Sequence, residues 1–213
     1  NNENYKIVLT ISLLIISFML IGLFDDLMSL KKNINTGLTS NQKLILQFLI
    51  SIIFIIYCRL NNFIPNNIQI ADTIINIGNF IYPLGVFVLL AESNSTNLTD
   101  GLDGLLSGCS ALIFTGLAIT ILVENQTNVE ILAPLCIVMA GTSMGFLFLN
   151  KYPAKLFMGD SGSLAIGASL GGIALISNHL WSLLIMGGVL AAESVSVIIQ
   201  VGIFKISKQI KGK

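Results

Sequence analysis

Long apolar runs separated by short polar segments make up most of the chain. A helix that crosses the hydrocarbon of a bilayer needs about 20 apolar residues, within a range of about 17–25. Seven runs come close to this length, and they predict spans at Ile7–Phe24, Leu44–Leu60, Phe80–Asn94, Leu105–Val123, Ile131–Leu149, Leu164–Ser177 and Trp181–Phe204. The third and sixth are short, so we expect their ends to lie within protein or a wet cavity.

The polar segment Asn61–Asn79 alternates isoleucine with polar residues, at Ile68 and Ile70 and again at Ile75 and Ile77. Alternation with a period of two predicts a short extracytoplasmic β-hairpin. The rest is expected to be all-α, a polytopic integral membrane bundle of about seven transmembrane helices. Because no linker or internal repeat divides the sequence, residues 1–213 are expected to form a single transmembrane domain.

The composition supports a membrane protein and excludes two other classes. Of the 213 residues, 54% are hydrophobic and only 10% are charged, whereas soluble domains carry about 25% charged residues. Eleven basic and eleven acidic residues give a net charge of zero, so there is no basic field to bind nucleic acid. The high apolar content also excludes a disordered chain.

The lysines and arginines predict the orientation of the bundle. If the segment from Asp25 to Lys43 faces the cytoplasm, only Lys6 and Arg59 of the eleven basic residues lie outside, as the positive-inside rule requires. The same orientation brings five aspartates to the cytoplasmic face, namely Asp25, Asp26, Asp100, Asp103 and Asp160. A transporter would place its ionisable groups nearer the midplane. The five acids therefore indicate an interfacial active site, although any single one could be a solvated loop charge.

The first of three motifs that carry acids is Gly22-Leu-Phe-Asp25-Asp26, at the end of the first span. Adjacent side chains on a helix point about 100° apart, so the two carboxylates need not share one ligand. Two acids this close to hydrocarbon are costly unless a cation or hydrogen bonds compensate them. One acid is expected to act as a general base and the other to position a metal or substrate.

The second motif is the polar segment Asn94–Gly104 before the fourth span. Asp100 and Asp103 are three residues apart and would share one face of a helical turn. Gly101 and Gly104 allow another group to approach the backbone closely. Helix capping by Asn97 or Thr99 is the alternative, but it does not explain two aspartates that are each followed by glycine.

The third motif lies between the fifth and sixth spans, from Asn150 to Ser163. Glycines on both sides of Asp160-Ser161 expose backbone N–H groups beside a helix N-terminus, which favours an anion. Phe157 offers a flat face for an aromatic ring, and Asp160 offers the hard oxygen ligand that Mg²⁺ prefers. The P-loop spacing is absent, and a structural turn is the competing interpretation.

The single histidine narrows the chemistry further. His179 lies in the outer loop after the sixth span, and roughly 30 Å of bilayer core separates it from the aspartates. Within this chain, Ser–His–Asp catalysis and histidine-based zinc chemistry are therefore excluded. Carboxylates, Mg²⁺, lysine and backbone N–H groups remain, and these suit phosphoryl transfer, in which positioning and charge neutralisation do most of the catalysis.

In this order the three motifs resemble the polyprenyl-phosphate N-acetylhexosamine-1-phosphate transferase superfamily. The stretch from Glu193 to Lys205, with Gln200 within it, resembles the phospho-N-acetylmuramoyl-pentapeptide transferase branch. The resemblance implies transfer of phospho-MurNAc-pentapeptide from UDP-MurNAc-pentapeptide to undecaprenyl phosphate, which yields lipid I and UMP. It also implies a Mg²⁺ cofactor and an active site at the cytoplasmic face of the bacterial plasma membrane, in contact with membrane lipid. A homodimer is compatible with it.

The resemblance also assigns roles to residues. Asp160 would ligate Mg²⁺, Asp25 and Asp26 would serve the lipid phosphate and metal region, and Phe157 would stack on uracil. The positions implied for the nucleoside pocket and further substrate contacts are Asn97, Leu98, Asp100, Gly101, Asp103, Asn150 and Gln200.

The sequence departs from the family pattern in its length, and several alternative functions stay open. Family members extend further at both ends, so we expect the 213 residues to be an incomplete gene product or a central portion, and the activity of this portion alone is in question. The nearest alternative is the sister branch that uses UDP-GlcNAc. The alternatives from other classes are a transporter or channel with the acids as an ion site, a structural membrane subunit, and an inactive fragment.

Overall fold

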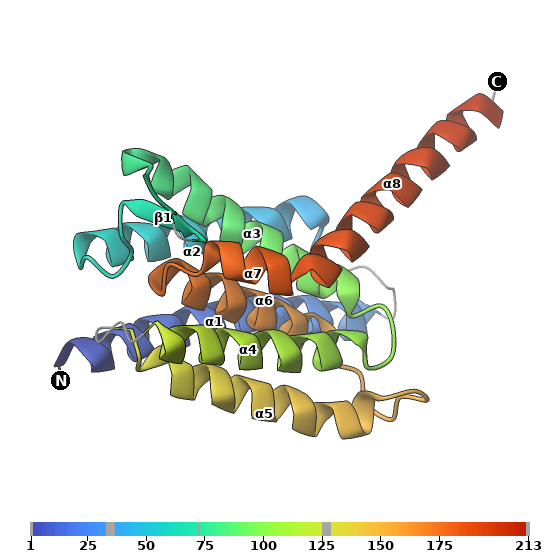
Figure 1. Cartoon of the computed structure of the whole chain (residues 1–213). Coiled ribbons are helices and arrows are strands. Elements are labelled where there is room, and N and C mark those ends of the chain that lie inside the picture. Colours follow the sequence, from blue (N-terminus) through green and yellow to red (C-terminus); the bar gives the residue numbers. More distant parts are fainter. Residues whose placement is uncertain (1, 33–36, 72, 125–128, 212–213) are drawn as a thin grey trace.

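The computed structural model of the protein describes residues 2–32, 37–71, 73–124 and 129–211. Within these ranges helices dominate and one small sheet is present (Figure 1). The elements are α1 Asn2–Lys32, α2 Ser40–Leu60, β1 Asn67–Ile70, β2 Thr73–Asn76, the 3₁₀ helix η1 Gly78–Phe80, α3 Ile81–Thr99, α4 Leu105–Val123, α5 Leu132–Asn150, α6 Gly159–Ile176, α7 Leu180–Met186 and α8 Gly188–Lys211.

Helix α6 forms the centre of the bundle. Every residue from Ser163 to Ile176 is buried, and α1, α3, α4 and α7 pack around this helix, while α5 packs on the outside of α4 (Figure 1). Glycine, alanine and serine recur along α6, and such small side chains let neighbouring helices approach closely in a membrane. The predicted short sixth span is thus a helix enclosed by protein.

Five helices are long and apolar enough to cross a membrane within the described ranges, namely α1, α2, α4, α5 and α6. This confirms the predicted all-α membrane bundle. The third predicted span corresponds to α3, which continues to Thr99 and is not one of the five. Its last turns, Asn94–Thr99, are polar, and the helix packs against α2, α6 and α8.

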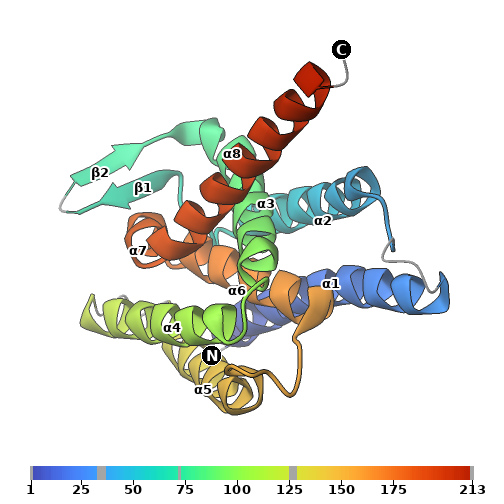
Figure 2. The same cartoon turned by 90° about the vertical axis from the view of Figure 1, so that its right-hand side faces the viewer.

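The prediction of one continuous seventh span, Trp181–Phe204, is wrong. The chain forms α7 and α8, which meet at a bend of 66°, so that the pair counts as at most one further span. Helix α8 leaves the bundle after this bend (Figure 2). Gly187 separates the helices and Gly188 begins the second, and glycine pairs are a common cause of sharp helix kinks.

The predicted hairpin is confirmed as an antiparallel pair in which Ile68 faces Ile75. The amide of Asn178 donates to Asn67 Oδ1 at 3.1 Å, which ties the hairpin to the end of the bundle where α6 stops. His179 lies at this same end, 3.4 Å from Glu124. Because the 18 residues of α6 span about 27 Å, His179 is far from Asp160, as the sequence predicts.

Candidate active site

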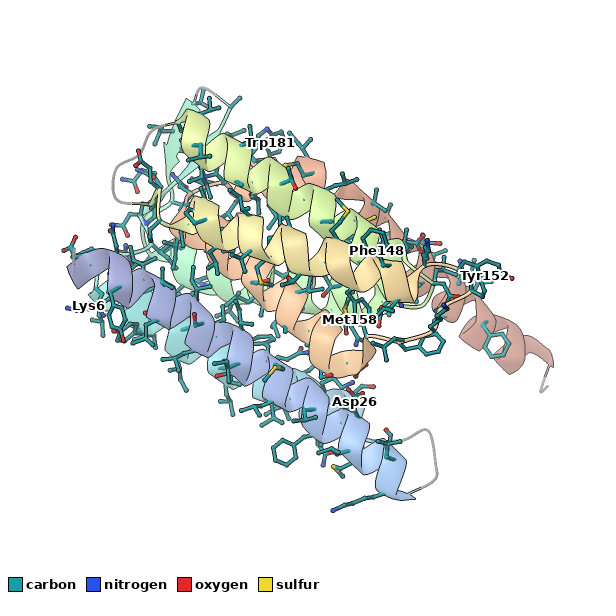
Figure 3. All side chains as sticks on the ribbon, turned by 90° about the horizontal axis from the view of Figure 1, so that it is seen from below. Lys6, Asp26, Phe148, Tyr152, Met158 and Trp181 are labelled. Carbon is teal, nitrogen blue, oxygen red and sulfur yellow. The ribbon has the colours of Figure 1, made fainter. Side chains whose placement is uncertain are left out.

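The ends of three helices that are distant in sequence meet at one end of the bundle. Asp25 and Asp26 lie near the end of α1, Lys43 lies in the first turn of α2, and Asp160 lies in the first turn of α6. Figure 3 shows Asp26 beside the start of α6, close to Met158. Carboxylate oxygens of Asp25, Asp26 and Asp160 lie within 4.8 Å of one another. We call these three aspartates, together with Lys43, the acidic cluster.

Lys43 joins two of the acids. Its Nζ lies 3.1 Å from Asp25 Oδ2 and pairs with Asp160 Oδ2. The side chains of Lys43, Asp25 and Asp160 are only 17%, 14% and 25% exposed, so water and salt screen this pairing less than they would at a free surface. The backbone N–H of Leu38 also donates to Asp25 Oδ1 at 2.6 Å, which ties the start of α2 to α1.

Asn97 connects the second motif to the cluster. Its Nδ2 donates to Asp160 Oδ1 at 2.7 Å and to Ser163 Oγ at 3.0 Å. One residue earlier on α3, Thr96 donates to the carbonyl of Ser163 at 2.8 Å. Asn97 therefore fixes one oxygen of Asp160, while Lys43 faces the other.

Asp26 has different partners from its neighbour Asp25. Its Oδ1 accepts from the backbone N–H of Asp160 at 3.3 Å and its Oδ2 from that of Ser161 at 3.1 Å. Gly22 lies one turn earlier on α1, and a Cβ there would come within 2.2 Å of the Asp160 carbonyl oxygen. Glycine at this position therefore allows α1 to contact the backbone of α6 directly.

Asp100 lies half-buried between α3 and α4. Burial raises the pKa of Asp100 to about 6, the carboxylates of Asp160 and Asp26 add to this increase, and the backbone N–H of Gly159 opposes it. The neighbouring Gly101 is exposed, and Leu98 is also accessible. Asp100 thus borders the acidic cluster, whereas the substrate contacts expected of Leu98 and Gly101 stay predictions.

Asp103 and Asn150 brace the loop at residues 151–158. Asp103 Oδ2 accepts from the backbone N–H of Ala154 at 2.9 Å. Asn150 is buried, its Oδ1 accepts from the Gly104 N–H at 3.0 Å and from Ser107 Oγ at 2.9 Å, and its Nδ2 donates to the Leu156 carbonyl at 3.0 Å. The structure gives both residues contacts within the protein, so their expected contacts with substrate stay predictions.

Two further predicted site residues differ in their placement. Phe157 is 72% exposed at the end of the braced loop, where its ring is free to stack. Gln200 is exposed on α8 and donates to Ser196 Oγ at 3.0 Å, one turn earlier on the same helix. The structure does not join Gln200 to the acidic cluster.

The donor set of the cluster fits a hard divalent cation. Three carboxylates from two helices offer oxygen atoms within reach of one ion, and Mg²⁺ prefers one or two carboxylates completed by water and substrate phosphate. Asp25 and Asp160 each direct one oxygen toward Lys43, so a cationic group already occupies the space between them.

Residues 8–178 match the family described as glycosyl transferase family 4. The chain belongs to this family. It is 78% identical over its whole length to the phospho-N-acetylmuramoyl-pentapeptide-transferase of Prochlorococcus marinus strain NATL2A, of which it covers 57%. It is also 52% identical over 201 residues, 94% of the chain and 57% of the relative, to the protein of the same name from Synechococcus sp. strain CC9605. The chain thus spans less than three fifths of the length of these relatives. Its long apolar helices make it a multi-pass membrane protein.

Lys43 is the cluster member that sequence reasoning missed, because it entered only the count of basic residues. The position of Lys43 in the first turn of α2 could have identified it as a candidate site residue. The first turn of α2 carries no acid and is capped by Thr39, so Lys43 places a positive charge near the positive end of the helix macrodipole. A lysine in this unfavourable position is expected to have an acidic partner elsewhere.

The buried amide of Asn150 should contribute strongly to stability. We expect Asn150→Ala to lower the free energy of unfolding by about 2–4 kcal/mol, because it leaves the Gly104 N–H and the Leu156 carbonyl without a partner. Thermal unfolding in detergent measures this. The matched control is Asn61→Ala, which removes one exposed bond to Tyr57 and should change little. Equal melting temperatures for both variants would contradict the bracing role of Asn150.

The raised pKa of Asp100 gives a stability effect that depends on pH. Its value of about 6 in the folded chain exceeds the ordinary 3.8, so ionised Asp100 destabilises the fold above pH 6, and this cost fades as the pH falls toward 4. We therefore expect Asp100→Asn to raise the melting temperature at pH 8 in EDTA and to leave it nearly unchanged at pH 4.5. A gain at pH 4.5 as large as that at pH 8 would rule out this origin.

Proposed function

We propose that the protein transfers phospho-MurNAc-pentapeptide from UDP-MurNAc-pentapeptide to undecaprenyl phosphate at the cytoplasmic face of the plasma membrane, releasing UMP and forming lipid I. The observation that carries the proposal is the acidic cluster, in which Lys43 joins Asp25 and Asp160 from three separate helices. Membership of family 4 and relatives named phospho-N-acetylmuramoyl-pentapeptide-transferase support it.

The charges of the cluster suit two anionic substrates. A nucleotide diphosphate and a lipid phosphate repel each other, and catalysis of phosphoryl transfer consists mainly of positioning and neutralising such charges. Lys43 supplies one positive charge. Asp25 and Asp160 are the residues that would hold Mg²⁺, which would neutralise phosphate charge and polarise a phosphoryl oxygen.

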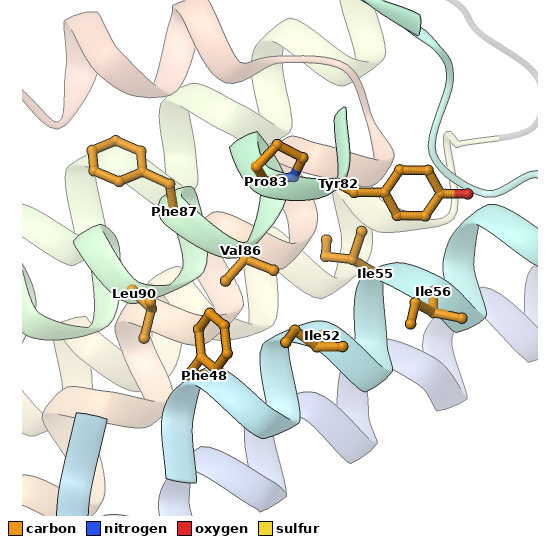
Figure 4. Close-up of a pocket in the computed structure, with 9 residues that line it drawn as sticks. All are labelled: Phe48, Ile52, Ile55, Ile56, Tyr82, Pro83, Val86, Phe87 and Leu90. Carbon is orange, nitrogen blue, oxygen red and sulfur yellow. The ribbon is translucent and has the colours of Figure 1, made fainter. Parts of the chain in front are cut away.

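A groove between α2 and α3 supports the lipid side of the proposal. It has a volume of about 460 Å³ and is lined by Phe48, Ile52, Ile55, Ile56, Tyr82, Pro83, Val86, Phe87 and Leu90 (Figure 4). Phe48 lies five residues after Lys43 on α2, about 7.5 Å along the helix. We propose that a polyprenyl chain in this groove directs its phosphate toward Lys43.

The loop at residues 151–158 and the passage from α3 to α4 offer groups for the nucleotide. Phe157 presents its ring at the end of a loop that Asn150 holds. Asp100 and Gly101 lie where α3 passes into α4. A uracil stacked on Phe157, with its ribose near Asp100, is the arrangement that we propose.

The proposal is tested by following radiolabelled UDP-MurNAc-pentapeptide into a butanol-extractable lipid product in the presence of undecaprenyl phosphate. Because the chain covers 57% of its relative, we would assay both the 213 residues and an extended chain that adds the flanking segments of that relative. The expected result is lipid I formation by the extended chain. Labelled lipid from UDP-GlcNAc instead would assign the chain to the sister reaction, and cation flux without either substrate would indicate a channel.

A further inference from the structure

Asp26 contacts the backbone of α6 and not Lys43, which is one of the groups expected to contact the substrates. The two oxygens of Asp26 accept the N–H groups of Asp160 and Ser161, whereas Asp25 faces Lys43. We propose that Asp26 is a positioning residue: it caps α6 from a different helix and thereby holds the Asp160 carboxylate in place. The inference rests on the proposed function for its effect on turnover, although the cap itself does not depend on it.

The start of α6 needs such a cap. The first N–H groups of a helix have no partner within the helix, and Met158, which precedes α6, makes no side-chain capping bond. A carboxylate at this point satisfies two N–H groups and interacts favourably with the positive end of the helix dipole. Asp26 supplies both effects, although it lies 134 positions away from Asp160 in sequence.

Two glycines keep the space around this contact clear. A Cβ at Gly22 would come within 2.2 Å of the Asp160 carbonyl oxygen, and one at Gly159 within 2.9 Å of Asp26 Oδ2. Gly159 also has a φ of +69°, which side chains rarely adopt. The backbone on both sides of the cap is therefore shaped so that the Asp26 carboxylate reaches the helix end.

The cap determines the position of the Asp160 side chain. With its N–H held by Asp26, Asp160 directs Oδ1 to Asn97 and Oδ2 to Lys43. Loss of the cap would free the first turn of α6 and shift a carboxylate that must lie close to the phosphates. Misplacement of a reacting group by about 1 Å can cost 10²-fold in rate. Two adjacent aspartates therefore have separate roles, with Asp25 facing Lys43 and Asp26 acting through Asp160.

Amide hydrogen exchange tests the cap without any need for turnover. In Asp26→Ala, and in Gly159→Ala, which keeps all three carboxylates, we expect the amides of Asp160 and Ser161 to exchange about tenfold faster. Gly78→Ala is the matched control, because Gly78 also has a positive φ, +54°, but nothing lies within 4 Å of its Cβ position. Unchanged exchange at Asp160 and Ser161 in both test variants would overturn the proposal. If either variant is poorly folded, the partly capping Asp26→Asn replaces it.

Measurement of kcat and KM distinguishes a positioning role of Asp26 from a direct catalytic role. In the extended chain, Asp26→Ala and Gly159→Ala should each lower kcat about 100-fold and leave KM for the UDP-sugar within threefold. The double variant should lose no more than the worse single variant, because both changes remove the same contact. Additive losses, or wild-type kcat in Gly159→Ala, would overturn the proposal. If the unaltered extended chain forms no UMP, the proposed function fails, while the exchange result still decides the cap.

Discussion

Asp160→Asn is expected to lower UMP release by about 10³-fold and to change the melting temperature little. The substitution keeps the size of the side chain and the oxygen that accepts from Asn97. It removes the negative charge that faces Lys43 and that would bind a divalent cation. Because phosphoryl transfer depends on charge neutralisation, the rate should fall far more than the stability.

The matched control is Glu3→Gln, the same acid-to-amide change at the start of α1, on an exposed side chain far along the helix from Asp25. It should retain full activity. UMP release, measured with saturating Mg²⁺ and undecaprenyl phosphate, compares the two variants. More than a tenth of the wild-type rate in Asp160→Asn would remove Asp160 from the catalytic centre.

Lys43→Met is expected to have the second largest effect, and that effect should depend on divalent cations. Without the ammonium group, the carboxylates of Asp25 and Asp160 face each other unpaired. Removing one partner of a fully buried pair costs about 3–5 kcal/mol, and the partial exposure of these side chains reduces this to about 2 kcal/mol. In EDTA the melting temperature should fall by about 5 °C, and millimolar Mg²⁺ should restore most of it.

Activity should not recover when stability does, because Mg²⁺ replaces the charge of Lys43 but not the contact with the lipid phosphate that we propose for it. We expect UMP release to stay about 100-fold lower. Lys6→Met, an exposed lysine near the other end of α1, serves as the control and should behave like the wild type. A melting temperature for Lys43→Met in EDTA equal to that of the wild type would show that Lys43 does not stabilise the cluster.

Hydropathy and charge distribution alone predicted most of the architecture. Apolar length located the helices, because the bilayer requires about 20 residues per span, and the alternating isoleucines located the hairpin. The break between α7 and α8 was not predictable in this way, because Gly187 and Gly188 lie within an otherwise apolar run. A hydropathy profile depends on residue composition and not on the direction of the backbone. It therefore does not reveal the bend of 66° between α7 and α8.

The acids of the site were predictable, but their individual contacts were not. The alternation of spans across the membrane placed Asp25, Asp26 and Asp160 at one face, and the structure brings them together. The contacts of Asp103 and Asn150 depend on the path of the loop at residues 151–158, which turns its own N–H and carbonyl groups toward them. No local sequence rule specifies that path.

The most direct test of the account measures UMP release by the extended chain from UDP-MurNAc-pentapeptide under three conditions: complete, without undecaprenyl phosphate, and with EDTA in place of Mg²⁺. We expect steady UMP release only in the complete reaction. UMP release that persists in EDTA would contradict a cluster that works by binding a divalent cation between two phosphates.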